Sequence, residues 1–447
     1  MFTYDHIHES DPEVFGLIQK ETDRQRDGLT LIPSENHTSP AVLESLATAF
    51  SDKYAEGYPG KRYYPGNEFA DAIENLARDR AKKLFDVPYA NVQPYSGSPA
   101  NLAIYSAICE LGDPIMGLHL LDGGHLTHGW KFSMTSKFWT SHPYHMKSDG
   151  TFDFDDMRNT AREQKPKVIF CGGTAVPRTI PWATFAEIAD EVGAYLVADI
   201  SHIAGLIAGE QHESPVPFVH AVMTTTHKTL RGPRGAMILV TQKGLDKDED
   251  LGKKIDKAII PGLQGGPHLN TIAGIAVALQ EAGTDEFRSY AEQIVTNAKA
   301  LANGLTSHGM NLVTGGTDNH LLLMDLSAQG SGRGIFLDKA LERIGIYANM
   351  NSIPHDPGPP LYPSGLRMGT PAITTRGMNV AEMAKIAEWI SNVYEHISDS
   401  KLPEDVKERP KAVKAFKKMI ADDEWYNDIK NDVRAFCEKF PIPILKS

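Results

Sequence analysis

Apolar positions along the chain repeat with two different spacings, and the spacing changes from one part of the sequence to the next. Residues 11–27 space them as a short amphipathic helix, so residues 1–45 are expected to form a helical arm. From about residue 69 onward, segments with helical spacing alternate with short apolar runs that turn residues bound. These runs lie at 90–97, 114–121, 167–173, 194–201, 221–227 and 235–241. They are typical of strands buried on both faces, and their alternation with helices predicts a mostly parallel α/β sheet.

Helices are expected between these strands. Their apolar residues recur at helical intervals in the segments 67–86, 98–111 and 181–193. In the second of these helices, Ser98 is the expected N-cap and Pro99 takes the first helical position.

The pattern changes again beyond about residue 285. A long helical segment at 286–305 precedes short strands with helices between and after them, including helical segments at 378–397 and 404–438. We therefore expect a smaller, C-terminal α+β domain. The proline-rich tract 352–365 is too long for a tight turn, so it is either a plain surface loop or a loop shaped for a site. The predicted division is an arm at 1–45, a large α/β domain at 46–284 and a small domain at 285–447.

Composition and charge argue against several classes of protein and site. The net charge of −12 gives no reason to expect nucleic acid or an anionic membrane as a partner. Cys109, Cys171 and Cys437 are few and far apart, which argues against a disulfide framework and a thiolate metal site. The polar, acidic N-terminus does not resemble a signal peptide, and no apolar run reaches about 18 residues. A cytoplasmic protein is expected.

Three predicted strand ends carry groups that belong together chemically. Lys228 follows one strand, Asp199 ends another, and the turn 96–101 leads from a third strand into a helix. Ligands of α/β sheets collect at the carboxyl ends of strands, and a helix N-terminus there favours an anion. Pyridoxal phosphate needs a lysine for covalent attachment, an acid at its ring nitrogen and an anion site for its phosphate. The set therefore predicts a pyridoxal-phosphate site.

Long motifs then indicate a family. The chain resembles the serine hydroxymethyltransferases, which are fold-type I pyridoxal-phosphate enzymes, from about residue 31 to residue 377. The motifs that carry the resemblance are SEN, KYAEGYPGKRYY, SGS with the nearby Asn101, GGHLTHG, VADISHIAGL, TTTHKTLRGPRG, PGLQGGPH and SGLRMGTPAITTRG. The resemblance implies a large domain with a mostly parallel seven-stranded sheet. It also implies reversible transfer of the hydroxymethyl carbon of L-serine to tetrahydrofolate, which gives glycine and 5,10-methylenetetrahydrofolate.

The resemblance also assigns roles around the cofactor. Lys228 would carry pyridoxal phosphate covalently, Asp199 would pair with the ring nitrogen, and His125 would stack on the ring. His202 would lie against the phenolic oxygen of the ring and assist the substrate. The remaining cofactor contacts implied are Ser96, Gly97, Ser98, Thr174, His227, and across a subunit interface Tyr54, Gly265 and Gly266. A site shared in this way makes a homodimer the minimum active unit, with a tetramer as an open alternative.

Substrate groups follow from the same resemblance. Arg367 would hold the amino-acid carboxylate, with help from Ser34. Glu56, from the partner subunit, would move protons near the serine hydroxyl and folate N5. The other residues expected to contact substrate or folate are Tyr63, Tyr64, Leu120, Gly123, Gly124, Leu126 and Asn351.

The sequence departs from the family pattern at a few positions, and two rival functions stay open. The chain has Tyr95, Pro99, Thr174-Ala-Val-Pro and Pro65 where other residues are common in the family, and none of these removes a catalytic group. The nearest rival is a folate-independent aldolase or transferase acting on another β-hydroxy or α-methyl amino acid. A second rival is a non-catalytic binding protein. No metal is expected, because His125 and His128 have no third ligand nearby in the sequence.

Overall fold

The computed structural model describes residues 4–445 and divides into two compact units. One unit is the continuous segment Thr38–Glu292. The other joins the segment that ends at His37 to the segment that begins at Gln293. The division into an arm at 1–45, a large domain at 46–284 and a small domain at 285–447 stays a prediction.

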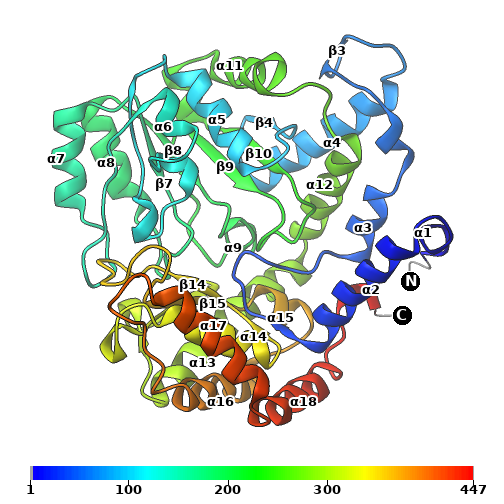
Figure 1. Cartoon of the computed structure of the whole chain (residues 1–447). Helices are drawn as coiled ribbons and strands as arrows, with labels where there is room; N and C mark the ends of the chain where they lie inside the picture. Colours follow the sequence, from blue (N-terminus) through cyan, green and yellow to red (C-terminus); the bar gives the residue numbers. More distant parts are fainter. Residues whose placement is uncertain (1–3, 446–447) are drawn as a thin grey trace. The chain divides into compact units, whose positions relative to one another are not determined.

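A seven-stranded sheet forms the centre of the Thr38–Glu292 unit (Figure 1). The strand order is β4-β10-β9-β8-β7-β5-β6, with parallel pairing from β6 through β9 and antiparallel pairing on both sides of β10. The mostly parallel sheet that the pattern predicts, and the seven strands that the family resemblance implies, are therefore confirmed. Its strands are β4 (Tyr89–Asn91), β5 (Pro114–Met116), β6 (Thr140–Ser141), β7 (Val168–Cys171), β8 (Tyr195–Asp199), β9 (Ala221–Thr225) and β10 (Ala236–Val240).

The central strands are hydrophobic because both of their faces are covered. Every residue of β7, β9 and β10 is buried, and helix α5 packs against β9 and β10. Helices α7 and α8 pack on each other, as do α4 and α12 (Figure 1). The main helices are α3 (Pro40–Leu46), α4 (Glu68–Phe85), α5 (Gly97–Ile108), α7 (Phe154–Gln164), α8 (Trp182–Val192), α11 (Leu251–Lys257) and α12 (Leu269–Ala282). Shorter elements are β2 (Gly57–Tyr58), β3 (Lys61–Arg62), α6 (Thr135–Phe138), α9 (Ala204–Ala208) and α10 (Gln242–Lys247).

The expected start of α5 was wrong by two residues. Ser96, with an extended backbone, is the N-cap, and the helix begins at Gly97 rather than after Ser98. The shift is possible because Gly97 has no side chain: a Cβ there would lie 2.8 Å from Thr225 Cγ2. The helix N-terminus can therefore sit directly against the end of β9.

The other unit is built on a four-stranded antiparallel sheet of order β11-β12-β15-β14. A separate parallel pair joins β1 to β13, and helix α2 packs against α18. Its strands are β1 (Leu29–Thr30), β11 (Asn311–Leu312), β12 (Leu321–Asp325), β13 (Ile346–Tyr347), β14 (Asn349–Asn351) and β15 (Gly365–Gly369). Its helices are α1 (Asp5–Ser10), α2 (Pro12–Asp27), α14 (Gly334–Arg343), α15 (Pro371–Thr375), α16 (Val380–His396), α17 (Arg409–Asp422) and α18 (Trp425–Cys437), while α13 (Asp285–Ser307) contains the boundary.

None of the helices within residues 4–445 is both long enough and apolar enough to cross a bilayer.

Candidate active site

Parallel strands bring the predicted cofactor residues to one edge of the sheet. Because β7, β8 and β9 are parallel neighbours, their carboxyl ends lie together. Asp199 ends β8, and Lys228 follows β9 by three residues. A pocket at this edge is lined by six of the predicted residues: Gly97, His125, Thr174, Asp199, His202 and Lys228.

The same pocket has lining residues that were not predicted as site residues. They are His128, Gly173, Ser201, Met223 and Thr225. His128 is the most informative, because its Nε2 lies 3.1 Å from Asp199 Oδ2. Its position three residues after His125 in the GGHLTHG motif was visible in the sequence, but its partner was not.

The Asp199 carboxylate is buried and yet held in its charged form. Asn101 Nδ2 donates to Oδ2 at 3.2 Å, and the Ser201 amide donates to Oδ1 at 3.1 Å. Burial alone would raise the pKa of Asp199, but the hydrogen bond from His128 and the nearby positive charges, including Lys228, hold it well below its ordinary value. A permanently charged carboxylate therefore faces the pocket.

His125 is kept neutral by its surroundings. Its Nδ1 lies 2.6 Å from Thr127 Oγ1, at the start of the short helix η3 (Leu126–His128). Burial, with a contribution from the charge of Lys228, lowers the pKa of His125 to about 4. The ring is therefore uncharged near neutral pH, which suits stacking on an aromatic cofactor.

The N-terminus of α5 adjoins the same pocket, because Gly97 both opens this helix and lines the pocket. Ser96 caps this helix without a side-chain hydrogen bond, and Gly97 opens it against β9. Thr225, which lines the pocket, has a buried Oγ1 without a hydrogen-bond partner among the described residues. The neighbouring His227 likewise has a buried Nδ1 without a partner among them. Unpaired donors beside a helix N-terminus fit a phosphate group, so the residues present suit pyridoxal phosphate.

Tyr54 and Glu56 form a second group with the Gly265–Gly266 turn. Tyr54 Oη donates to Glu56 Oε1 at 3.1 Å, and its ring meets Tyr64 edge-on at 5.3 Å. A Cβ placed on Gly265 would lie 3.1 Å from Glu56 Oε1, and one on Gly266 would lie 3.4 Å from the Tyr54 ring. Among the described residues, those that line the Lys228 pocket include none of this group.

Tyr95, where the sequence departs from the pattern of the family it resembles, helps to position that turn. Its hydroxyl donates to the Gly266 carbonyl at 2.6 Å, and its ring stacks on His268 at 4.1 Å. The Tyr95 amide donates to Gln264 Oε1 at 3.0 Å. The departure from the family pattern therefore keeps a defined structural contact.

The predicted folate segment adjoins the cofactor pocket. Gly123 has a φ of 98°, and a Cβ on Gly124 would lie 1.9 Å from the Leu118 carbonyl oxygen, so the turn requires glycine at both positions. The Thr174 amide donates to the Gly123 carbonyl at 2.6 Å. Leu120 is partly buried and Leu126 is exposed. Tyr63, which directly follows β3, is exposed as well. This turn therefore leaves Leu126 accessible to a ligand.

Ser34, Asn351 and Arg367 belong to the other unit. Arg367 lies on β15 opposite Asn349 of β14, and its Nε donates to Asn349 Oδ1 at 3.1 Å. Burial lowers the pKa of Arg367 to about 10, which leaves the guanidinium protonated near pH 7. A Cβ on Gly369 would lie 2.9 Å from Pro33, which brings the Ser34 segment to the same end of β15.

Asn349 was not predicted from the sequence. Its contact with Arg367 depends on the register of two antiparallel strands, which the motif alone does not give.

Comparisons with known proteins agree on one family. The family model described as serine hydroxymethyltransferase matches residues 7–390. A serine hydroxymethyltransferase of Sorangium cellulosum is 55% identical over 394 residues, which cover 88% of this chain and 91% of that protein. One of Acidothermus cellulolyticus is 51% identical over 435 residues, covering 97% and 96%. One of Desulfotalea psychrophila is 48% identical over 440 residues, covering 98% and 96%.

Proposed function

The chain belongs to the serine hydroxymethyltransferase family, and we propose that its own residues carry out the reaction of that family in the roles given below. The reaction transfers the hydroxymethyl carbon of L-serine to tetrahydrofolate and gives glycine and 5,10-methylenetetrahydrofolate. Enzymes of the family use pyridoxal 5′-phosphate, with tetrahydrofolate as co-substrate. The observation that carries the proposal is the single pocket that gathers Lys228, Asp199 and His125.

Lys228, Asp199 and the α5 N-terminus would hold the cofactor. When bound, pyridoxal phosphate supplies an electron sink for the electrons released at the substrate α carbon. The Lys228 amine would be the attachment point, and Ser96, Gly97 and Ser98 would hold the phosphate at the N-terminus of α5. Asp199 stays ionised and would hold a proton at the ring nitrogen, which would keep the ring electron-poor. His125 and His202 orient the ring and exclude water from it.

Arg367 is proposed to bind the substrate carboxylate. Its guanidinium is half-buried, protonated and oriented by Asn349, and a planar guanidinium binds a carboxylate through two parallel hydrogen bonds. Ser34 lies on the segment that packs at the same end of β15. Both residues would select amino acids with a free carboxylate, and Asn351 would read the edge of the pterin.

Glu56 is proposed to move a proton at the serine hydroxyl and at folate N5. It contacts Tyr54 and the Gly265–Gly266 turn, and it does not line the Lys228 pocket of its own chain among the described residues. This separation supports a shared site, in which a second copy of the chain supplies Glu56, Tyr54, Gly265 and Gly266. The active unit is then a homodimer. Tyr63, Tyr64, Leu120, Gly123, Gly124 and Leu126 would line the folate subsite.

The variant Glu56→Gln tests this function against a folate-independent aldolase. The test compares glycine formation from serine plus tetrahydrofolate with cleavage of allo-threonine, which needs no folate. We expect a loss of about 10²–10⁴-fold in the first reaction and little change in the second, because Glu56 serves the folate-dependent proton transfers.

Two controls complete that experiment. The exposed Glu44→Gln is the matched carboxylate control and keeps both activities, while Lys228→Ala removes the attachment point and loses both. Equal losses of the two reactions in Glu56→Gln would remove the proposed role of Glu56. Turnover of allo-threonine without any turnover of serine plus tetrahydrofolate in the unmodified enzyme would favour the aldolase.

A further inference from the structure

Three ionisable side chains form a cluster in the same unit, outside the Lys228 pocket. His119 precedes the short helix η2 (Leu120–Asp122), Asp122 ends it, and His145 follows β6 by four residues. One donor atom of each residue lies within 4.8 Å of the donor atoms of the other two. Asp122 Oδ2 lies 2.7 Å from His145 Nδ1 and 3.9 Å from His119 Nδ1. None of the three residues lines the Lys228 pocket.

The backbone holds the two segments of this cluster together. Leu118 and Tyr144 form a parallel bridge, and the His119 amide donates to the Tyr144 carbonyl at 3.0 Å. The amides of Asp122 and Gly124 both donate to the His119 carbonyl, at 3.1 and 3.0 Å. The segments that carry the three side chains are therefore fixed before any ligand binds. A preformed arrangement lowers the cost of ordering on binding.

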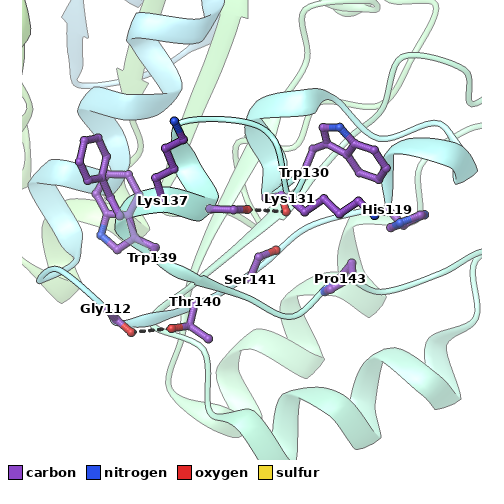
Figure 2. Close-up of a pocket in the computed structure, with 12 residues that line it drawn as sticks. Gly112, His119, Trp130, Lys131, Lys137, Trp139, Thr140, Ser141 and Pro143 are labelled. Atoms are coloured by element: carbon purple, nitrogen blue, oxygen red, sulfur yellow. Dashed lines mark hydrogen bonds between the residues drawn. The ribbon is translucent and has the colours of Figure 1, made fainter.

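Charged side chains near this cluster and a pocket beside His119 influence what the cluster can bind. The negative charges of Asp153 and Asp156 favour a positive charge at His145. Asp156 also has a buried Oδ2 without a hydrogen-bond partner in the described part of the chain. The Lys131 ammonium opposes a cation at His119. Figure 2 shows His119 at one end of a pocket of about 570 Å³, beside Trp130 and Lys131. Of the three cluster residues, His119 is the one that lines this pocket.

Two imidazoles and one carboxylate are a donor set for a divalent first-row transition metal with an open position. Around a tetrahedral zinc ion with bonds of about 2.0–2.1 Å, ligand atoms lie about 3.3–3.5 Å apart. The two separations from Asp122, 2.7 and 3.9 Å, lie on either side of that value, and all three ligand atoms lie within 4.8 Å of one another. We propose that His119, Asp122 and His145 bind a divalent transition-metal ion of the zinc class, with water in the remaining position.

Titration of the chelator-treated holoenzyme with zinc chloride, followed by isothermal calorimetry, tests the site. We expect one zinc ion per chain at this site. His119→Ala and His145→Ala each weaken that binding by at least about tenfold, because each removes one ligand. His142→Ala is the matched control, since His142 lies three residues from His145 and outside the cluster, and it keeps the affinity.

Two further readouts make the result decisive. Zinc should raise the melting temperature of the unmodified protein and of His142→Ala but not of the two cluster variants, because a ligand stabilises only the state that binds it. Anomalous scattering from a zinc-soaked crystal should place the ion between His119, Asp122 and His145. Equal zinc affinity in the unmodified protein and both cluster variants would overturn the proposal. So would an ion located at other histidines, which is adventitious binding only. None of these readouts depends on catalytic activity, so failure here is distinguishable from failure of the proposed reaction.

Discussion

Asp199 is a buried carboxylate whose charge is maintained by the residues around it. His128, Asn101 and the Ser201 amide all contact it, and together with nearby charges they hold its pKa well below the ordinary value despite burial. Its position at a strand end was evident in the sequence, but these contacts were not. His128 and Asn101 lie about 70 and 100 residues from Asp199 in the sequence, and only the fold brings them to it.

Replacing Asp199 with asparagine tests whether the negative charge of this side chain, rather than its size, is needed. Asparagine keeps the size and one oxygen but cannot hold a proton at the ring nitrogen. We expect the rate constant for serine cleavage to fall by about 10²–10⁴-fold, with cofactor still bound. Steady-state kinetics and the cofactor absorbance measure the two quantities. Asp190→Asn, on an exposed carboxylate of α8, is the control. A variant with unchanged kcat would contradict the role of Asp199.

At the scale of elements, long buried strands were easier to predict than a short edge strand or a break between two helices. The runs that became β7, β9 and β10 are buried throughout, so β7 and β10 are continuously apolar and β9 is apolar up to its two final threonines. Strand β6 was missed because Thr140–Ser141 is a two-residue edge strand without an apolar side chain. The segment 404–438 forms two helices because Asp423 has an extended backbone and its side chain accepts from the Trp425 amide at 3.0 Å.

Arg376 joins the N-terminal segment to the end of α18. It is buried, and its guanidinium donates to the carbonyls of Gln25, Arg26, Gly28, Cys437 and Phe440. Arg376→Met would leave several of these buried carbonyls without donors. We expect the free energy of unfolding to fall by about 3–5 kcal/mol in urea denaturation.

A surface arginine provides the control for this prediction. Arg434, on α18, is more than half exposed, and Arg434→Met should change stability by no more than about 0.5 kcal/mol. Similar stabilities of the Arg376→Met and Arg434→Met proteins would show that the buried hydrogen bonds do not hold the N-terminal segment in place.

At the scale of the whole molecule, stability should fall as the pH is lowered from about 6.5 to about 4. Burial lowers the pKa of His37, His125 and His220 to about 4 and that of His227 to about 3. In this window the unfolded chain binds protons that the folded chain does not, so acid favours unfolding. Each of these histidines contributes a slope of up to about 1.4 kcal/mol per pH unit.

Urea denaturation at a series of pH values measures this dependence. His220 lies away from the proposed active site, and its Nδ1 accepts from the Leu196 amide at 2.9 Å. His220→Asn keeps an acceptor but removes the titrating group, so it should reduce the slope between pH 6.5 and 4. An unchanged slope in this variant would show that His220 does not titrate in the expected range.

The proposed pairing of subunits has a consequence that mixing two variants tests. Lys228 and Glu56 belong to separate groups in the described structure. If a second copy supplies Glu56, mixing the inactive Lys228→Ala and Glu56→Gln proteins creates one intact site in each mixed dimer. Random exchange should then restore about a quarter of the folate-dependent activity. No recovery, with mixed dimers confirmed by mass spectrometry, would place both residues in one subunit.

The most direct test of the account is the position at which the vitamin B6 cofactor is attached. The holoenzyme is reduced with borohydride, digested, and its peptides are mapped by mass spectrometry. The account predicts a pyridoxyl phosphate group on Lys228, and a loss of both the label and serine turnover in Lys228→Ala. A label on another lysine, or full serine turnover by Lys228→Ala, would contradict it.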